Sequence, residues 1–209
     1  SAYGKTTDLT FIGGSQHVYS FGKCLFMPAD LTAGLEYNRD NLKDDMWGYN
    51  RYTKQTVNIG SAFLQNEWKN EKWSILLGGR LDKHNLINHV IFSPRANLRF
   101  NPSEDINLRL SYSSGFRAPQ AFDEDLHIEN VGGTVSMIER AKNLKEEKSQ
   151  SFSASADMYH RFGAFQVNFL VEGFYTRLSD VFVLENIGER DGILIKERRN
   201  GSGAKVLGL

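Results

Sequence analysis

The feature that most constrains the fold of this chain is an alternation of apolar and polar side chains with a period of two. Residues 106–113 place Ile, Leu, Leu and Tyr at alternate positions, with Asn, Arg, Ser and Ser between them. Residues 31–38, 92–100, 151–158 and 165–172 largely follow the same rule. Because successive side chains of a strand point to opposite faces, the pattern predicts an all-β fold with about nine or ten strands.

The two faces of these predicted strands favour a transmembrane β-barrel over a soluble sandwich. The polar face is rich in Ser, Asn, Arg, Thr and Gly, which suits a wet interior. The apolar face continues for about nine to eleven residues, the length a tilted strand needs to cross hydrocarbon, whereas ordinary strands have about five or six. The mean hydropathy of −0.43 does not exclude such a barrel, because only alternate residues face lipid.

The connections between the predicted strands alternate between short and long, which indicates an antiparallel meander. The short connections contain turn residues such as Asn, Pro and Gly and lie at 23–30, 69–72, 101–105 and 161–164. The longer and more polar connections lie near 40–53, 83–89 and 115–149. Transmembrane barrels show this asymmetry, with short periplasmic turns and long extracellular loops.

Aromatic residues gather at the ends of the predicted strands that carry short turns. Trp68 and Trp73 flank one turn, and Phe162 and Phe165 bracket another. Amphipathic rings are expected where a membrane meets water, which is one interpretation of this pattern. The alternative is that aromatic residues simply favour strands and hairpin ends.

Composition and motifs exclude several other classes of protein. Lys plus Arg and Asp plus Glu each number 25, so the chain lacks the basic excess of a nucleic-acid binder. The single cysteine, Cys24, excludes an intramolecular disulfide framework and a cysteine-based zinc site. No nucleophile elbow, phosphate loop or dinucleotide fingerprint is present, so we expect no enzyme activity, catalytic residue, metal site or cofactor.

Three ordered blocks resemble the barrel of TonB-dependent outer-membrane receptors. Residues 108–122 form a strand that ends in Gly-Phe-Arg-Ala-Pro and enters a loop. Residues 143–149 read Asn-Leu-Lys-Glu-Glu-Lys-Ser and are similar to the next block of the family, with Glu146 where Pro is usual. Residues 174–180 are similar to the strand end that follows. The order and the spacing of the blocks also match.

This resemblance covers most of residues 31–209 and implies that 1–209 is part of a receptor barrel, roughly 22-stranded in the family. The plug domain, the TonB box and a terminal strand ending in an aromatic residue are not in the sequence. The chain begins at Ser1 without an initiator Met and stops within a predicted strand, so we expect it to be a piece of a longer protein.

The resemblance also implies a function, a location and partners. The chain is expected in the bacterial outer membrane, in a receptor for TonB-dependent uptake of a scarce nutrient. The commonest substrates of such receptors are ferric siderophores, haem or cobalamin, and carbohydrates are also known. The implied partners are outer-membrane lipid, a small metal chelate or similar nutrient, and the TonB energy-coupling complex through the absent plug. Nucleic acid is not expected.

Two other classes remain open from the residues alone. One is a different outer-membrane barrel, such as a porin or a translocator, which would lack the three family blocks. The other is a soluble antiparallel β-domain that acts as a binding module. In such a domain the apolar faces of the strands would pack on a second layer of protein.

Candidate ligand-binding residues lie in the predicted external loops. Trp47, Tyr49 and Tyr52 are placed to stack on an aromatic ligand, or alternatively to pack the 40–53 loop on its neighbours.

His84 and His89 share the 83–89 loop and are candidates to contact a metal complex or haem, although their spacing is not that of a helical metal site. Phe116 and Arg117 are expected at the rim where the wall meets the longest loop. Arg117 has an alternative role, in which it pairs with a loop carboxylate such as Asp123 and only orders the loop.

Overall fold

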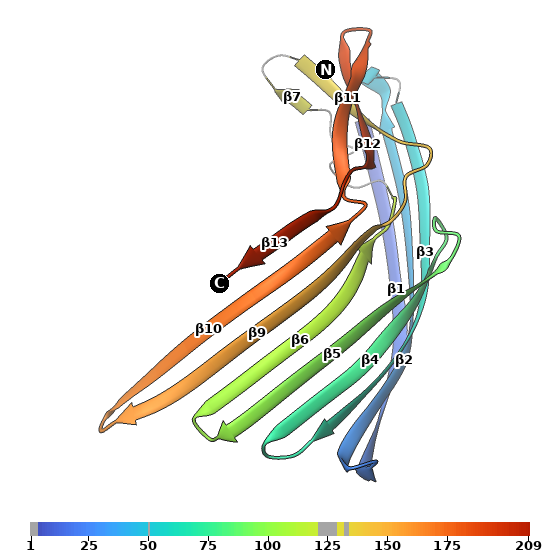
Figure 1. Ribbon diagram of the computed structural model, residues 1–209. Coiled ribbons are helices and arrows are strands. Elements are labelled where there is room, and N and C mark those ends of the chain that lie inside the picture. The colour runs from blue at the N-terminus through green and yellow to red at the C-terminus, as the bar shows by residue number, and fades with distance from the viewer. Residues whose placement is uncertain (1–3, 50, 121–128, 132–133) are drawn as a thin grey trace.

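The computed structural model describes residues 4–49, 51–120, 129–131 and 134–209, and nearly all of them lie in strands (Figure 1). The described part of the chain has no helix that is long and apolar enough to cross a membrane. The main sheet contains, in spatial order, β1 (Gly4–Cys24), β2 (Met27–Met46), β3 (Arg51–Lys69), β4 (Trp73–His84), β5 (Val90–Ser103), β6 (Ile106–Arg117), β9 (Glu147–Phe162), β10 (Phe165–Ser179) and β13 (Ala204–Gly208).

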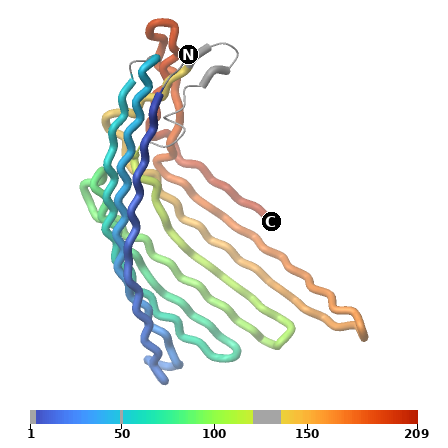
Figure 2. The backbone as a smooth tube through the Cα atoms, turned by 180° about the vertical axis from the view of Figure 1, so that it is seen from behind, coloured from blue at the N-terminus to red at the C-terminus, as the bar shows by residue number. Residues whose placement is uncertain are grey.

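All neighbours in the main sheet pair antiparallel, which confirms the predicted all-β antiparallel meander. Its nine strands agree with the predicted nine or ten, but the described part of the chain has thirteen strands, because a second sheet adds four. The sheet curves into an open trough, as the view from behind shows (Figure 2). We call the end with the short turns the turn end, and the end with the long connections the mouth end.

A second, four-stranded sheet lies at the mouth end, and the sequence pattern did not predict it. We call it the cap sheet, and it contains, in spatial order, β11 (Phe182–Arg190), β12 (Ile193–Asn200), β8 (Thr134–Arg140) and β7 (Glu129–Val131). Its strands come from two insertions, one between β6 and β9 and one between β10 and β13. The insertions meet where β12 pairs with β8 in parallel.

The main sheet has an apolar outer face and a polar inner face, as the alternation predicted. One row of the outer face joins Leu98, Leu110, Ala154 and Gly173 across four strands. Large apolar side chains on this face are exposed in every region of the sheet from β1 to β10. Among the described residues no second layer packs on them, so the soluble-sandwich alternative is not supported.

The turn end is built by tight turns and stacked aromatic rings. In the turn between β3 and β4, Oδ1 of Asn70 accepts hydrogen bonds from the backbone amides of Lys72 and Trp73. The Trp73 ring stacks on Phe100 with centroids 4.1 Å apart, and Phe26 stacks on Trp68 at 5.6 Å. The predicted clustering of aromatic residues at this end is therefore present.

Strands β1, β2 and β3 rise well above their neighbours toward the mouth end (Figure 1). Most of the predicted 40–53 loop is strand, because β2 continues to Met46 and β3 begins at Arg51. The turn between them is the 3-10 helix η1 (Trp47–Tyr49). Above the apolar band both faces of these strands are polar, so the alternation that marks a strand in the sequence disappears.

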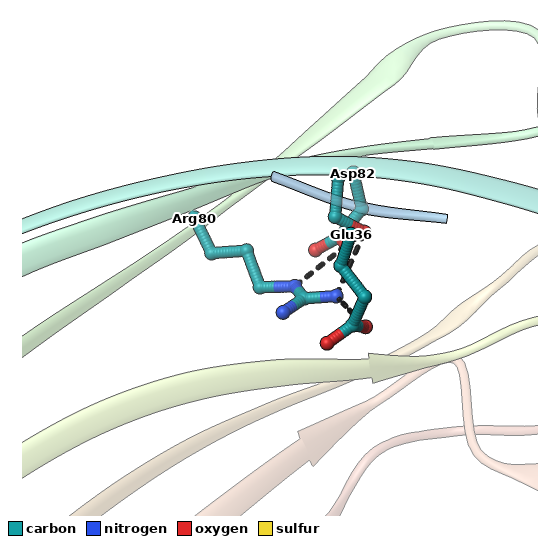
Figure 3. A network of polar contacts seen from close by, with 4 residues as sticks. Glu36, Arg80 and Asp82 are labelled. Carbon is teal, nitrogen blue, oxygen red and sulfur yellow. Dashed lines mark hydrogen bonds and ion pairs between the residues drawn. The ribbon is translucent and has the colours of Figure 1, made fainter. Parts of the chain in front are cut away.

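The inner face carries a network of polar contacts between β2, β3 and β4 (Figure 3). Arg80 donates from Nη2 to Oε1 of Glu36 at 2.7 Å and from Nε to Oδ1 of Asp82 at 2.8 Å. Ser61 donates from Oγ to the same Asp82 oxygen at 2.6 Å. These bonds compensate the burial of the Asp82 carboxylate and tie three strands together.

Candidate functional site

The long connections of the main sheet and the cap sheet surround a hollow of about 540 Å³, which we call the mouth hollow. Its walls come from the start of β3, the β4–β5 loop, the segment after β6, the end of β8 and residues 141–144. The lining residues are Arg51, Tyr52, Thr53, Leu86, Pro119, Met137, Ile138, Glu139, Arg140, Ala141, Lys142 and Leu144.

Strand β8 is held at the hollow from two sides. On one side it pairs with β12, with Met137 opposite Ile195 and Arg140 opposite Arg198. On the other side Nη1 of Arg140 donates a hydrogen bond of 2.7 Å to Oε1 of Gln55, which lies on the inner face of β3. The cap sheet therefore reaches over the inner face of the tall strands, and the hollow lies at this junction.

The mouth hollow is cationic. Arg51, Arg140 and Lys142 contribute positive charges, and Glu139 contributes the one acidic side chain among the described lining residues. Nη1 of Arg190 lies 3.1 Å from Oε1 of Glu139 and offsets its charge. Guanidinium and ammonium groups at such an opening suit an anionic ligand.

The three predicted aromatic residues have different positions. Tyr52 is exposed and lines the mouth hollow. Trp47 is exposed in η1, at the tip between β2 and β3, and is not among the residues that line the hollow. Tyr49 ends η1, and its side chain lies outside the described part of the structure. Tyr52 pairs with Asp45 in a row whose side chains point to the outer face of the sheet, so its ring is turned away from the inner face. Contact with a ligand stays a prediction for all three residues.

His84 is fully buried at the end of β4. Its Nδ1 accepts a hydrogen bond from the backbone amide of Leu86 at 3.0 Å, so the proton lies on Nε2, which faces Oε1 of Gln120 at 3.3 Å. Burial lowers the pKa of His84, partly opposed by the bond to Gln120. With both ring nitrogens used, we place His84 among the residues that hold the loop rather than among ligand contacts.

His89 is joined to the start of β9. Its Nε2 lies 3.1 Å from Oε1 of Glu146, and Nζ of Lys148 lies 3.0 Å from the same oxygen. Burial by itself would raise the pKa of Glu146, but a backbone hydrogen bond and Lys148 hold that pKa below its usual value. Glu146, which stands where the family block usually has Pro, thus connects the β4–β5 loop to β9.

Phe116 and Arg117 lie at the end of β6, as predicted for a rim. Phe116 packs against a small core of Ile87, Ile91 and Ala118. The guanidinium of Arg117 lies over the ring of Phe182, 5.6 Å from its centroid, and so contacts the start of β11. Asp123, the suggested partner of Arg117, lies outside the described residues. Both side chains are placed to fix the loops, and a direct ligand contact stays a prediction.

Sequence reasoning missed the cationic residues of the hollow. Arg51 follows the η1 turn, whereas Arg140 and Lys142 lie about ninety residues further along the chain. Basic residues in the polar stretch after β8 were a visible signal, but nothing in the sequence indicated that β8 returns to β3. No group of three or more His, Cys, Asp or Glu side chains in the described ranges is arranged to hold a metal ion.

Solved structures with the same fold include siderophore and hemophore receptors. The siderophore receptor PirA from Pseudomonas aeruginosa matches with a TM-score of 0.81 and 16% identity over 97% of this chain and 38% of its own. A mutant of the ferric enterobactin receptor PfeA from the same organism, in complex with enterobactin, matches with a TM-score of 0.71, 18% identity, 98% of this chain and 33% of its own.

A double mutant of the hemophore receptor HasR from Serratia marcescens, in complex with its hemophore HasA and heme, matches with a TM-score of 0.77 and 15% identity. That match covers 98% of this chain and 39% of HasR. The chain therefore spans less than two fifths of each of these three receptors. No curated protein sequence matches it significantly.

The family model described as "TonB dependent receptor-like, beta-barrel" matches residues 1–206, almost the whole chain. This match agrees with the meander, its apolar outer face and the polar inner face, and it favours a receptor over a porin or a translocator. The chain belongs to the TonB-dependent receptor β-barrel family.

Proposed function

We propose that the chain forms part of the wall and the outer mouth of a receptor in the bacterial outer membrane, which captures an anionic iron chelate for uptake. The chelate is a ferric siderophore or haem, the ligands named for the receptors of similar fold. Members of this family are outer-membrane transporters rather than enzymes. The proposal assigns the main sheet to the wall and the cap sheet to the ligand-facing mouth.

The placement in the membrane is supported by the outer face of the main sheet. Its exposed apolar side chains need a partner, and hydrocarbon covers them without a second protein layer. The stacked rings at the turn end suit the membrane–water interface. Since barrels of this kind have short turns on the periplasmic side, the mouth end faces the exterior.

The observation that carries the ligand class is the charge of the mouth hollow. Three cationic side chains face an opening large enough for part of a small chelate, and the carboxylate of Glu139 is already paired. Ferric catecholates and haem both carry negative charge on a flat or aromatic framework. Such a ligand gains from charge-assisted contacts with Arg140 and Lys142.

Capture at the mouth precedes passage along the polar inner face. The inner wall presents Ser, Asn, Arg and Thr side chains, which favour a wet path over an apolar one. Energy for passage would come from the inner-membrane TonB complex through a plug domain, as the family implies. Loop and cap substitutions should therefore weaken capture before they change any later step.

Binding of ferric enterobactin and of haem to the purified receptor that carries this chain tests the proposal. Replacing Arg140 and Lys142 together by Ala should raise the Kd of the chelate that binds by about five- to tenfold, since partly exposed charges contribute up to about 1 kcal/mol each. Tyr52→Ala removes a ring that points to the outer face of β3 and should leave the Kd nearly unchanged. Calorimetry gives both values.

Matched variants separate binding from folding. Lys72→Ala removes the same charge in a turn at the opposite end and should leave Kd unchanged. Arg140→Lys keeps the charge and should retain most of the affinity. Equal affinity of the wild type and the double Ala variant for both chelates would show that the mouth hollow is not the binding site.

A further inference from the structure

The outer face of β1, β2 and β3 changes character above the apolar band. Phe11 and Leu9 end the band on β1 and are 60% and 67% exposed. The register then joins Thr7 on β1, Lys43 on β2 and Lys54 on β3 in one row, two residues above Leu9. All three side chains are exposed and point to the same side of the sheet as Leu9.

Lys43 and Lys54 lie directly opposite each other on adjacent antiparallel strands. Like charges in this arrangement destabilise a sheet unless an anion lies between them. The described residues supply no ion pair for either lysine. Asp45 is the nearest outward carboxylate on β2, but it lies one row higher, between Lys5 and Tyr52. Arg39, lower on β2, adds another outward cation.

A hollow of about 340 Å³ lies at the two lysines. Its lining includes the hydroxyls of Thr7 and Thr56, the amide of Asn41, and the apolar side chain of Leu9. Thr56 donates from Oγ1 to Oδ1 of Asn41 at 2.9 Å, and the amide nitrogen of Asn41 is a further hydrogen-bond donor at this hollow. Two ammonium groups with amide and hydroxyl donors are the groups that bind a phosphate.

We propose that this hollow binds the phosphate of a phosphorylated glycolipid in the outer leaflet of the membrane. The lipid source is favoured over free phosphate because the lysine row lies about 7 Å above Leu9, at two strand residues of about 3.4 Å each. That distance places a headgroup phosphate at the lysines while its acyl chains cover Leu9 and Phe11. The phosphate also removes the repulsion between Lys43 and Lys54.

This inference rests on the outer-membrane placement in the proposed function, and not on the iron chelate. Lipid A that remains bound to the detergent-purified receptor, counted by native mass spectrometry, is the direct readout. Replacing Lys43 and Lys54 together by Ala should lower bound lipid A by about tenfold or more, because each basic residue at a membrane surface strengthens binding of anionic lipid by about fivefold. The Lys23→Ala, Lys72→Ala double variant removes two lysines at the turn end and should retain lipid A.

Lys54→Glu separates a lipid site from a purely structural row of charges. It creates an opposite-charge pair with Lys43, so it should unfold at a higher temperature than the wild type in neutral detergent. It should nevertheless lose lipid A. Retention of lipid A by both Lys54→Glu and the double Ala variant would overturn the proposal.

Inorganic phosphate tests the source of the ligand. At millimolar concentration it should leave the bound lipid A in place and should not raise the unfolding temperature of lipid-free receptor. If inorganic phosphate instead displaces lipid A and stabilises the receptor equally well, the site is a general phosphate site and the lipid assignment fails. No iron chelate enters these measurements, so their outcome is independent of the binding experiment above.

Discussion

The main sheet and the cap sheet expose similar apolar side chains to different surroundings. Val171 on the outer face of β10 is 43% exposed, and Ile187 in β11 of the cap sheet is 47% exposed. In our account Val171 lies against hydrocarbon, whereas Ile187 lies in water beyond the membrane. Fractional exposure alone therefore does not tell whether a side chain contacts lipid or water. The position of a residue along the wall decides how much its apolar side chain contributes to the stability of the fold.

The two sheets are also stabilised differently. The main sheet is a continuous antiparallel ladder, in which most neighbours are joined by short turns. The cap sheet depends on the parallel pairing of β8 and β12 and buries Ile138 and Ile195 within the protein. Damage to the cap sheet should stay local, whereas damage to the outer face of the wall should lower the stability of the whole barrel.

The largest expected effect comes from an arginine on the outer face of the wall. Val171→Arg should lower the free energy of unfolding by about 2–4 kcal/mol in lipid vesicles, because a charge in the middle of the hydrocarbon is costly. Ile187→Arg makes the same change at an equally exposed site in the cap sheet and should cost less than about 0.5 kcal/mol. Denaturant unfolding in vesicles measures both, and equal costs would remove the distinction between the sheets.

A smaller effect is expected from the polar network on the inner face. Asp82→Asn removes the charge of a buried carboxylate that accepts bonds from Ser61 and Arg80. Since about a third of Arg80 remains exposed, the expected cost is about 1–2 kcal/mol.

The matched substitution in the cap sheet is Glu139→Gln. Its ion pair with Arg190 has side chains 42% and 66% exposed, and such pairs contribute about 0–1 kcal/mol. Thermal unfolding measures the loss of stability in each of the two variants. A larger loss of stability from Glu139→Gln than from Asp82→Asn would contradict the view that the main sheet contributes most of the stability.

The smallest effect is a pH dependence confined to the mouth end. The pKa of His84 in the folded protein lies below its ordinary value of about 6.5, so His84 binds a proton more tightly in the unfolded loop than in the folded one. The stability that neutral His84 contributes is complete above that ordinary pKa and is lost as the pH falls through the folded pKa. Proteolysis of the β4–β5 loop should therefore accelerate below neutral pH, with the wall unaffected.

Two variants test whether His84 causes this pH response. His84→Leu should make proteolysis nearly independent of pH, whereas His160→Gln at the turn end should behave as the wild type. An acid-sensitive loop in His84→Leu would show that another group controls the opening.

The sequence could predict the wall because its physical cause is local. Each strand that crosses hydrocarbon must place apolar groups at alternate positions, and residues 106–113 show this without knowledge of any partner. The same reasoning fails above the membrane. There the outward side chains of β2 and β3 are polar as well, so residues 40–46 carry no clear alternation and were predicted as loop.

The candidate site could be predicted only in part, because it is assembled from distant segments. Tyr52 was identified by its aromatic side chain in a polar stretch next to a turn, but its pairing with Asp45 turns the ring to the outer face. Arg140 and Lys142 reach the same hollow through the pairing of β8 with β12, a contact between two insertions that no local pattern indicates. His84 was identified by residue type alone, and its burial depends on Gln120 from another connection.

A scan of spin labels along residues 150–158 of β9 in lipid vesicles tests most directly whether hydrocarbon covers the outer face of the main sheet. We expect the accessibility of the labels to alternate with a period of two residues. Labels at Phe152, Ala154, Ala156 and Met158 should be accessible to oxygen dissolved in the lipid, and labels at the intervening positions should be accessible to a water-soluble relaxing agent. If labels at the four apolar positions are shielded from both reagents, as in a closed protein core, the account is wrong.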